Sequence, residues 1–185
     1  MEIKPKTVAN SECIMNEIVL PNDTNNLGHL MGGRLLYLMD VCAAIASARH
    51  TNRVCVTAAV DSVDFHSPIR TGEVVTLISR VNRVFRTSME VEIDVWAENT
   101  IERTRRKSNR AFYTFVAVDA NNKPTEVPPV IPETEAQKRC YVNAERRREM
   151  RLLLAGRIKL ADAPALKEEF LMILRGEREQ NKSMK

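Results

Sequence analysis

The sequence has few aromatic residues, no long apolar run and no cysteine motif, and each shortage excludes a class of protein. Aromatic side chains make up 5% of the 185 residues, too few for a surface that stacks several exposed bases. No run reaches the roughly 18–20 apolar residues of a membrane-spanning helix. The four cysteines follow no CxxC or Cys/His spacing, which argues against a zinc module and a disulfide scaffold. The amino-terminal segment lacks the apolar stretch of a signal peptide, so we expect reduced thiols in a cytoplasmic protein without a membrane partner.

The net charge of +4 is unevenly distributed along the chain. Residues 1–135 carry 15 basic and 17 acidic side chains, whereas residues 136–185 carry 13 basic and 7 acidic ones. The basic character therefore belongs to the C-terminal part, while a nucleic-acid-binding face is normally built into the folded domain. We expect no nucleic-acid partner.

A proline-rich segment divides the sequence. Four prolines fall between residues 124 and 132, and each removes a backbone donor and fixes φ. Beyond them, residues 135–155 and 163–176 have helical composition and spacing. The sequence therefore predicts a main domain over 10–130 and a charged helical C-terminal extension over 131–185.

The main domain has the pattern of an α+β fold, with one helix over 34–50 and several strands. The strand candidates are 13–20, 54–66, 73–85, 88–99 and 107–119. The helix is apolar nearly all round, which is typical of a buried helix, and short connections imply antiparallel neighbouring strands. Residues 88–99 alternate between apolar and mostly acidic side chains, which predicts one dry and one wet face. We expect a sheet curled around the helix, with open edges that a homo-oligomer would cover.

Asp40 lies in the middle of the apolar helix. An ionised carboxylate without partners is costly in such a place, and a structural carboxylate would more naturally cap the helix N-terminus. Asp40 is therefore a candidate for chemistry. The alternative is that it faces a polar gap or caps a neighbouring loop.

A glycine pair, Gly32 and Gly33, falls at the start of this helix. Unpaired N–H groups and the helix dipole favour negative charge there, and such a site can hold an oxyanion that develops on a carbonyl. An ordinary glycine-rich turn is the alternative. His29 lies in the preceding loop and could contact a substrate, but the three histidines share no metal-binding spacing, so we expect no metal. Arg106 belongs to a basic run that either contacts phosphates or is only solvated.

Three runs of the sequence resemble the acyl-CoA thioesterases of the hotdog fold, most closely the cytosolic acyl-CoA hydrolase subfamily. They are DTNNLGHLMGGRLLYLMD, VTAAVDSVDFHSPIRTGEVV and FRTSMEVEIDVWAE, and the resemblance covers about residues 13–130 in the same order. It implies a sheet wrapped around a long central helix and hydrolysis of acyl-CoA to free acid and CoA, with no cofactor. It also implies active sites at the interfaces of a homo-oligomer, with a dimer as the minimal unit and often a trimer of dimers.

The resemblance further implies roles for single residues. Asp40 matches the catalytic aspartate of the helix, as general base or as a nucleophile that forms an anhydride. Asn25 matches the asparagine of the D-x-N-x-x-G loop, which acts across the interface from the aspartate, and Gly33 matches the glycine whose N–H polarises the thioester carbonyl. Arg86, Thr87 and Ser88 match the segment that lies along the pantetheine and phosphates of CoA in relatives. Together with Gly32, His29 and Arg106, which were singled out by their places in the sequence, they are the predicted CoA-binding residues.

Two other functions share this fold. A non-catalytic acyl-CoA sensor usually carries a helix-turn-helix ahead of the domain, and only about twelve residues precede the first predicted strand. Hydratase or dehydratase chemistry normally centres on a catalytic histidine, and the predicted central helix has none except His50 at its end.

Overall fold

The computed structural model describes residues 3–61, 63, 65 and 67–183, with side chains through residue 173. The chain divides into two compact units, residues 1–137 and 138–185. None of the helices in these described ranges has the length and apolarity needed to span a bilayer.

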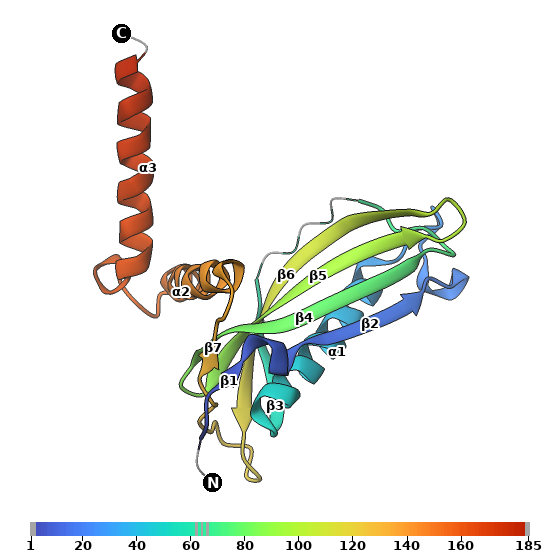
Figure 1. Ribbon diagram of the computed structural model, residues 1–185, viewed down its shortest axis with the longest axis horizontal. Coiled ribbons are helices and arrows are strands. Elements are labelled where there is room, and N and C mark those ends of the chain that lie inside the picture. The colour runs from blue at the N-terminus through green and yellow to red at the C-terminus, as the bar shows by residue number, and fades with distance from the viewer. Residues whose placement is uncertain (1–2, 62, 64, 66, 184–185) are drawn as a thin grey trace. The chain divides into compact units, whose positions relative to one another are not determined.

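The first unit is a five-stranded antiparallel sheet with one long helix, α1, against one face (Figure 1). Its elements are β2 (Cys13–Ile18), α1 (Gly32–Thr51), β3 (Val54–Val60), β4 (Val74–Phe85), β5 (Ser88–Asn99) and β6 (Thr104–Val118), in the sheet order β2-β4-β5-β6-β3. Two short parallel strands, β1 (Lys6–Thr7) and β7 (Val130–Ile131), pair separately. The expected α+β arrangement is confirmed.

One predicted strand is shorter than expected. The pattern predicted a strand over 54–66, but β3 ends at Val60. Residues 62, 64 and His66 of that prediction lie outside the described residues. The strand pairs only with β6 and has a register shift between Thr57 and Ala59, so β3 forms a free edge of the sheet.

Helix α1 is buried on one side only, which corrects the expectation of a helix covered all round. The residues that face the sheet are fully or almost fully buried: Leu35, Leu38, Met39, Cys42, Ala43 and Ala46. On the other side Tyr37 is 57% exposed and Ile45 is 36% exposed. A single curled sheet has only one concave face, so it leaves the opposite side of the helix open.

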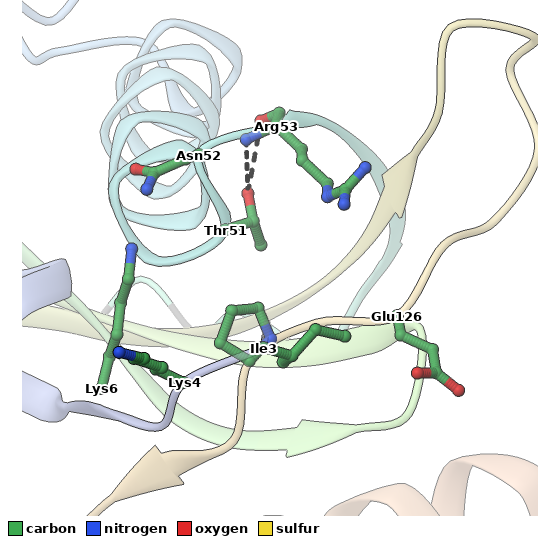
Figure 2. A pocket seen from close by; sticks show the side chains of 8 residues that line it. Ile3, Lys4, Lys6, Thr51, Asn52, Arg53 and Glu126 are labelled. Carbon is green, nitrogen blue, oxygen red and sulfur yellow. Dashed lines mark hydrogen bonds between the residues drawn. The ribbon is translucent and has the colours of Figure 1, made fainter. Parts of the chain in front are cut away.

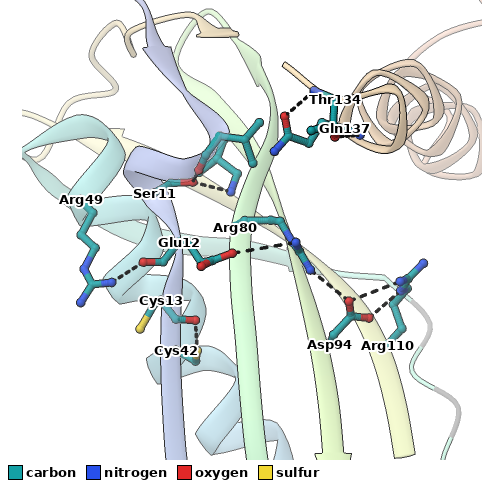
Figure 3. Close-up of polar contacts among 12 residues, drawn as sticks. Ser11, Glu12, Cys13, Cys42, Arg49, Arg80, Asp94, Arg110, Thr134 and Gln137 are labelled. Atoms are coloured by element: carbon teal, nitrogen blue, oxygen red, sulfur yellow. Dashed lines mark hydrogen bonds and ion pairs between the residues drawn. The ribbon is translucent and has the colours of Figure 1, made fainter. Parts of the chain in front are cut away.

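The acidic face of β5 is also different from the expected wet face. Glu90 is 1% exposed and accepts a hydrogen bond from Asn82 at 3.1 Å. Asp94 is 6% exposed, because long cationic side chains from β4 and β6 lie across it. Asp94 contacts Arg80 at 3.2 Å and Arg110 at 2.7 Å (Figure 3). It also contacts Lys107 at 2.5 Å. Burial raises the pKa of Asp94, but the hydrogen bonds and charges of Arg110 and Lys107 outweigh burial and lower it overall.

Cys42 joins α1 to the sheet through buried polar contacts. Its Sγ lies 3.7 Å from the Cys13 carbonyl on β2 (Figure 3). The same Sγ lies 3.2 Å from Ser79 Oγ on β4. Ser79 Oγ in turn donates to the Cys42 carbonyl at 2.8 Å. Burial raises the pKa of the Cys42 thiol to about 12, and burial also raises the pKa of the Cys55 thiol.

The second unit is built from helices, as the C-terminal pattern predicted. Helix α2 (Glu135–Leu154) begins in the first unit, and α3 (Pro164–Ser183) follows it. The buried Glu149 accepts hydrogen bonds from the backbone N–H of Leu166 at 2.8 Å and of Ala165 at 3.4 Å. A carboxylate at this position satisfies donors that the helix leaves free and complements the helix dipole, so Glu149 caps α3.

Candidate active site

The loop before α1 fixes the orientation of the Asn25 side chain. Asn25 Oδ1 accepts hydrogen bonds from the backbone N–H of Leu27 at 2.9 Å and of His29 at 3.2 Å. A backbone bond from Gly28 to the Asn25 carbonyl closes the turn, and Gly28 has φ +70°, which a glycine adopts without strain. Because Oδ1 is occupied by donors, Asn25 presents its Nδ2 as a hydrogen-bond donor.

The N-terminus of α1 offers free backbone donors. Gly32 and Gly33 are the first two helical residues, and the N-cap residue Met31 makes no side-chain cap bond. The first backbone hydrogen bond of the helix runs from Leu35 N to the Met31 carbonyl at 3.0 Å. Within the described part of the chain the Gly33 N–H has no acceptor, and no atom lies within 4 Å of where a Gly33 Cβ would be. This N–H can therefore donate to a group that approaches from outside the chain.

A pocket of about 410 Å³ lies beside this N-terminus. It is lined by Asn25, His29, Leu30, Gly32, Leu35, Phe65, Ser67, Pro68, Ile69 and Asn109. Five of these side chains are apolar and four are polar, and such a mixture of apolar and polar groups suits a small-molecule site. The structure therefore brings together three of the predicted residues, Asn25, His29 and Gly32.

Asp40 lies on the open side of α1, where Thr57 of β3 donates its hydroxyl proton to Asp40 Oδ1 at 2.6 Å. The buried Tyr113 of β6 is close by: burial, followed by the negative charge of Asp40, raises the pKa of the Tyr113 phenol to about 12. One carboxylate oxygen of Asp40 is thus positioned by Thr57. The other oxygen can accept a proton or a hydrogen bond from a ligand.

Asp40 does not line the pocket that contains Asn25. It lies seven residues along α1 from Gly33, which is about 10 Å at the helical rise of 1.5 Å per residue. One chain therefore carries the donors and the carboxylate at two separate places.

The predicted CoA-binding segment Arg86–Ser88 forms the turn between β4 and β5. Arg86 has φ +39°, and its carbonyl accepts a hydrogen bond from Val127 N at 2.9 Å. Because β4 begins at Val74, next to the loop that lines the pocket, this turn lies the length of β4 away, roughly 36 Å. The structure does not bring Arg86–Ser88 and Asn25 together within one chain.

Arg106 pairs with Glu73 through two hydrogen bonds, of 2.7 and 2.8 Å, and also donates to the Pro68 carbonyl at 2.6 Å. The hydrogen bonds from Arg106 lower the pKa of Glu73, against the raising effect of burial. Pro68 lines the pocket, so Arg106 holds a wall of the pocket in place. Its predicted contact with CoA stays a prediction.

No group of three or more metal-ligating side chains occurs among the residues that the structure describes. Sequence reasoning missed Thr57, because a threonine in a strand is an ordinary residue. The signal that could have found it is its position on the strand that directly follows the helix of Asp40, since sequential elements usually pack together.

Comparison with known proteins identifies a family. The thioesterase superfamily model matches residues 27–104. A protein of Bacillus subtilis, named as an uncharacterised acyl-CoA thioester hydrolase, is 42% identical over 74% of this chain and 80% of its own length. The cytosolic acyl coenzyme A thioester hydrolase of Rattus norvegicus is 36% identical over 75% of this chain, which spans 37% of that longer protein.

Two solved structures are similar along most of the chain. A hexameric acyl-CoA thioesterase has a TM-score of 0.80 and 41% identity, and covers 83% of this chain and 98% of its own. The acyl-CoA hydrolase of Staphylococcus aureus, in complex with butyryl-CoA, CoA and CoA disulfide, has a TM-score of 0.76 and 34% identity, and covers 90% and 98%. The chain therefore belongs to the thioesterase superfamily and has the hotdog fold of its acyl-CoA hydrolases.

Proposed function

We propose that this chain hydrolyses acyl-CoA to a carboxylic acid and coenzyme A, with Asp40 and Thr57 of one subunit and Asn25 and Gly33 of another at each active site. The observation that carries the proposal is the hydrogen bond between Thr57 and Asp40, on the open side of an otherwise apolar helix. A carboxylate held in this way by a hydroxyl is suited to proton transfer.

The S. aureus hydrolase supports the choice of residues. Its solved variants replace an asparagine, an aspartate and a threonine by alanine, one at a time. The spacings between the three replaced positions are 15 and 17 residues, the same as the spacings between Asn25, Asp40 and Thr57. Thr57 is the one of these three residues that the sequence analysis did not predict and that the structure adds.

The mechanism follows from the groups at the site. Asp40 takes a proton from a water molecule as the water oxygen attacks the thioester carbon. The carbonyl oxygen becomes an oxyanion, which the Gly33 N–H stabilises at the helix N-terminus, and Asn25 Nδ2 orients the water or the thioester. Collapse of the tetrahedral intermediate breaks the C–S bond, and Asp40 returns the proton to the sulfur of CoA. A nucleophilic Asp40 that forms an anhydride is the alternative route. Neither route requires a metal or a cofactor.

The assembly proposed here is a dimer in which the open side of α1 and the free edge of β3 meet a second copy. Exposed apolar side chains support this, with Tyr37 and Ile45 on α1 and Val54, Val56 and Val60 on β3. Three such dimers would make a hexamer, the state named for the similar hexameric thioesterase. By similarity to the cytosolic hydrolase of the rat, we place the protein in the cytoplasm.

Thiol release from a series of acyl-CoA substrates tests the activity. Asp40→Asn keeps the shape of the side chain and its bond to Thr57 but cannot take a proton, so turnover should vanish while the circular dichroism spectrum stays unchanged. Near-normal kcat in this variant would contradict the mechanism. Binding of acyl-CoA without turnover by the wild type would instead indicate a sensor.

Mixed subunits test the shared site. Asn25→Ala and Asp40→Ala subunits should each be inactive alone, but dimers that contain one of each should have one intact site and one doubly damaged site. We expect partial recovery of activity after the two variants are mixed and refolded. If isolated mixed dimers stay inactive, the two residues act within one subunit.

A further inference from the structure

A second pocket, of about 370 Å³, lies at the C-terminal end of α1 (Figure 2). It is lined by Ile3, Lys4, Lys6, Thr51, Asn52, Arg53, Glu126 and Pro128. Three of these side chains are cations and one is an anion, so the lining carries a net positive charge. Such a pocket favours an anionic ligand.

The negative end of the α1 dipole would oppose an anion here, but two of its last carbonyls already accept hydrogen bonds, one of them from a cation. Lys6 Nζ donates to the Arg49 carbonyl at 3.0 Å. The N–H of Asn52, which has a left-handed conformation with φ +53°, donates to the Ala48 carbonyl at 2.7 Å. These contacts partly satisfy the helix C-terminus, and Arg53, which also lines the pocket, follows the C-cap residue Asn52.

We propose that this pocket binds the phosphate groups of the substrate's CoA portion, with Arg53 and Lys4 as direct contacts and Lys6 as a supporting charge. The inference rests on the proposed function, because it requires the thioester at Asp40 and Thr57. Arg53 directly precedes β3 and lies four residues before Thr57, which is about 13 Å along an extended chain. The pantetheine arm has about twelve bonds, equivalent to four extended residues or roughly 14 Å. If the arm runs along β3 from a thioester at Asp40 towards the start of the strand, its length brings the phosphates to Arg53.

A second observation links the pocket to the predicted CoA-binding turn. Glu126 and Pro128 line the pocket, and Val127 between them donates its N–H to the Arg86 carbonyl at 2.9 Å. The pocket and the Arg86 turn therefore share one hydrogen-bonded segment. The chain that supplies Asp40 also supplies both groups of basic residues for the same CoA molecule.

The test compares an acyl-CoA with the thioester of the same acid and N-acetylcysteamine, which has the thioester but no phosphates. Arg53→Gln should raise KM for acyl-CoA about tenfold, the range of one charge-assisted hydrogen bond, with kcat unchanged. Both parameters for the N-acetylcysteamine thioester should stay unchanged. Equal losses with both substrates, or no loss with either, would overturn the proposal.

Glu126→Gln tests the sign of the electrostatic effect. Removing the one acidic side chain of the pocket should lower KM for acyl-CoA and leave the truncated substrate unaffected, whereas damage to the fold would raise KM. Arg103→Gln is the matched control, because Arg103 is an exposed cation in the turn between β5 and β6, at the other end of the sheet. A tenfold change in KM in this control would show that net charge, and not the pocket, sets the affinity.

An experiment with ADP distinguishes between the two ligands whose phosphates could occupy the pocket, the CoA portion of the substrate and a regulatory nucleotide. If the pocket holds the phosphates of CoA, ADP should compete with acyl-CoA in the wild type and leave turnover of the truncated thioester unchanged. An effect of ADP on kcat for the truncated thioester would overturn the proposal in favour of a regulatory nucleotide. If the wild type hydrolyses neither substrate, the proposed function fails, and calorimetry of CoA binding then decides: the pocket proposal requires weaker binding by Arg53→Gln.

Discussion

Thr57 and Asp40 come from different elements, and their hydrogen bond of 2.6 Å depends on β3 packing beside α1. Thr57→Val keeps the size of the side chain but removes the donor. A hydrogen bond to a charged group contributes about 1.5–3 kcal/mol, which corresponds to roughly a 10- to 100-fold fall in kcat. Thr57→Ser should keep most of the activity. Thiol release and urea unfolding of both variants check this, and full activity in Thr57→Val would remove Thr57 from the mechanism.

A substitution at Gly33 should reduce activity without reducing stability, because the Cα of Gly33 faces open space in the chain. Gly33→Ala should leave the free energy of unfolding unchanged or raise it by up to about 1 kcal/mol, since alanine favours a helix. Its kcat/KM should nevertheless fall, because a methyl group would obstruct the approach of the thioester to the N–H. Chemical denaturation and steady-state kinetics measure the two effects. Unchanged kcat/KM would mean that no substrate reaches this face.

At this scale the sequence predicted Asp40 and the glycine pair because each is unusual in its place: a carboxylate within an apolar helix, and two glycines at a helix start. Thr57 was not predicted, since nothing in its strand is unusual and only its place on the strand after the helix of Asp40 points to it. Its role arises only when β3 and α1 pack together. The same holds for Tyr113, whose pKa depends on burial and on the nearby charge of Asp40.

At the scale of elements, His50 joins the end of α1 to the proline-rich segment. The fully buried His50 lies with Nε2 at 2.8 Å from the Pro128 carbonyl, so the ring donates a proton there. Its Nδ1 is buried and has no partner in the described structure. Burial lowers the pKa of His50 below its ordinary value, against the raising effect of the Pro128 bond, and Lys6 lowers it further.

Because the pKa of His50 is lowered in the folded protein, we expect the free energy of unfolding to fall in mild acid. Below about pH 6.5 the unfolded chain binds a proton at this residue that the folded chain does not bind. The free energy of unfolding should therefore decrease as the pH falls from about 6.5 towards 5. His50→Gln can still donate to Pro128 but does not titrate, so its curve should be flatter in this range. Urea unfolding at a series of pH values measures the slopes, and equal slopes would contradict the prediction.

Hydrophobic periodicity predicted the positions of most elements. It did not predict what lies against β5 and against α1. The alternation in β5 correctly separated its two faces, yet it could not show that Arg80, Lys107 and Arg110 cover Asp94. Those cations belong to neighbouring strands, and only the register of the sheet brings them together. Likewise, the apolar sequence of α1 could not distinguish a helix covered by its own sheet from one covered partly by another chain.

At the scale of the whole molecule, the open side of α1 predicts the effect of a charge at the proposed subunit contact. Ile45→Glu should dissociate the oligomer, because an unpaired carboxylate would be buried there, and activity should fall with it if each site uses two subunits. Ile101→Glu is the control, since Ile101 is 92% exposed in the turn between β5 and β6. Light scattering coupled to gel filtration measures the mass. A variant Ile45→Glu that keeps the wild-type mass would exclude this face as the contact.

The proposed reaction releases a free thiol next to a protein that has cysteines of its own. Thiol–disulfide exchange requires a thiolate as the attacking group, and burial holds the pKa of Cys42 at about 12 and raises that of Cys55. At neutral pH these two thiols therefore stay protonated and do not react with disulfides that form from the released coenzyme. The burial of Cys42 thus protects this thiol from covalent capture by the released coenzyme, although the hydrogen bond with Ser79 acts in the opposite direction on its pKa.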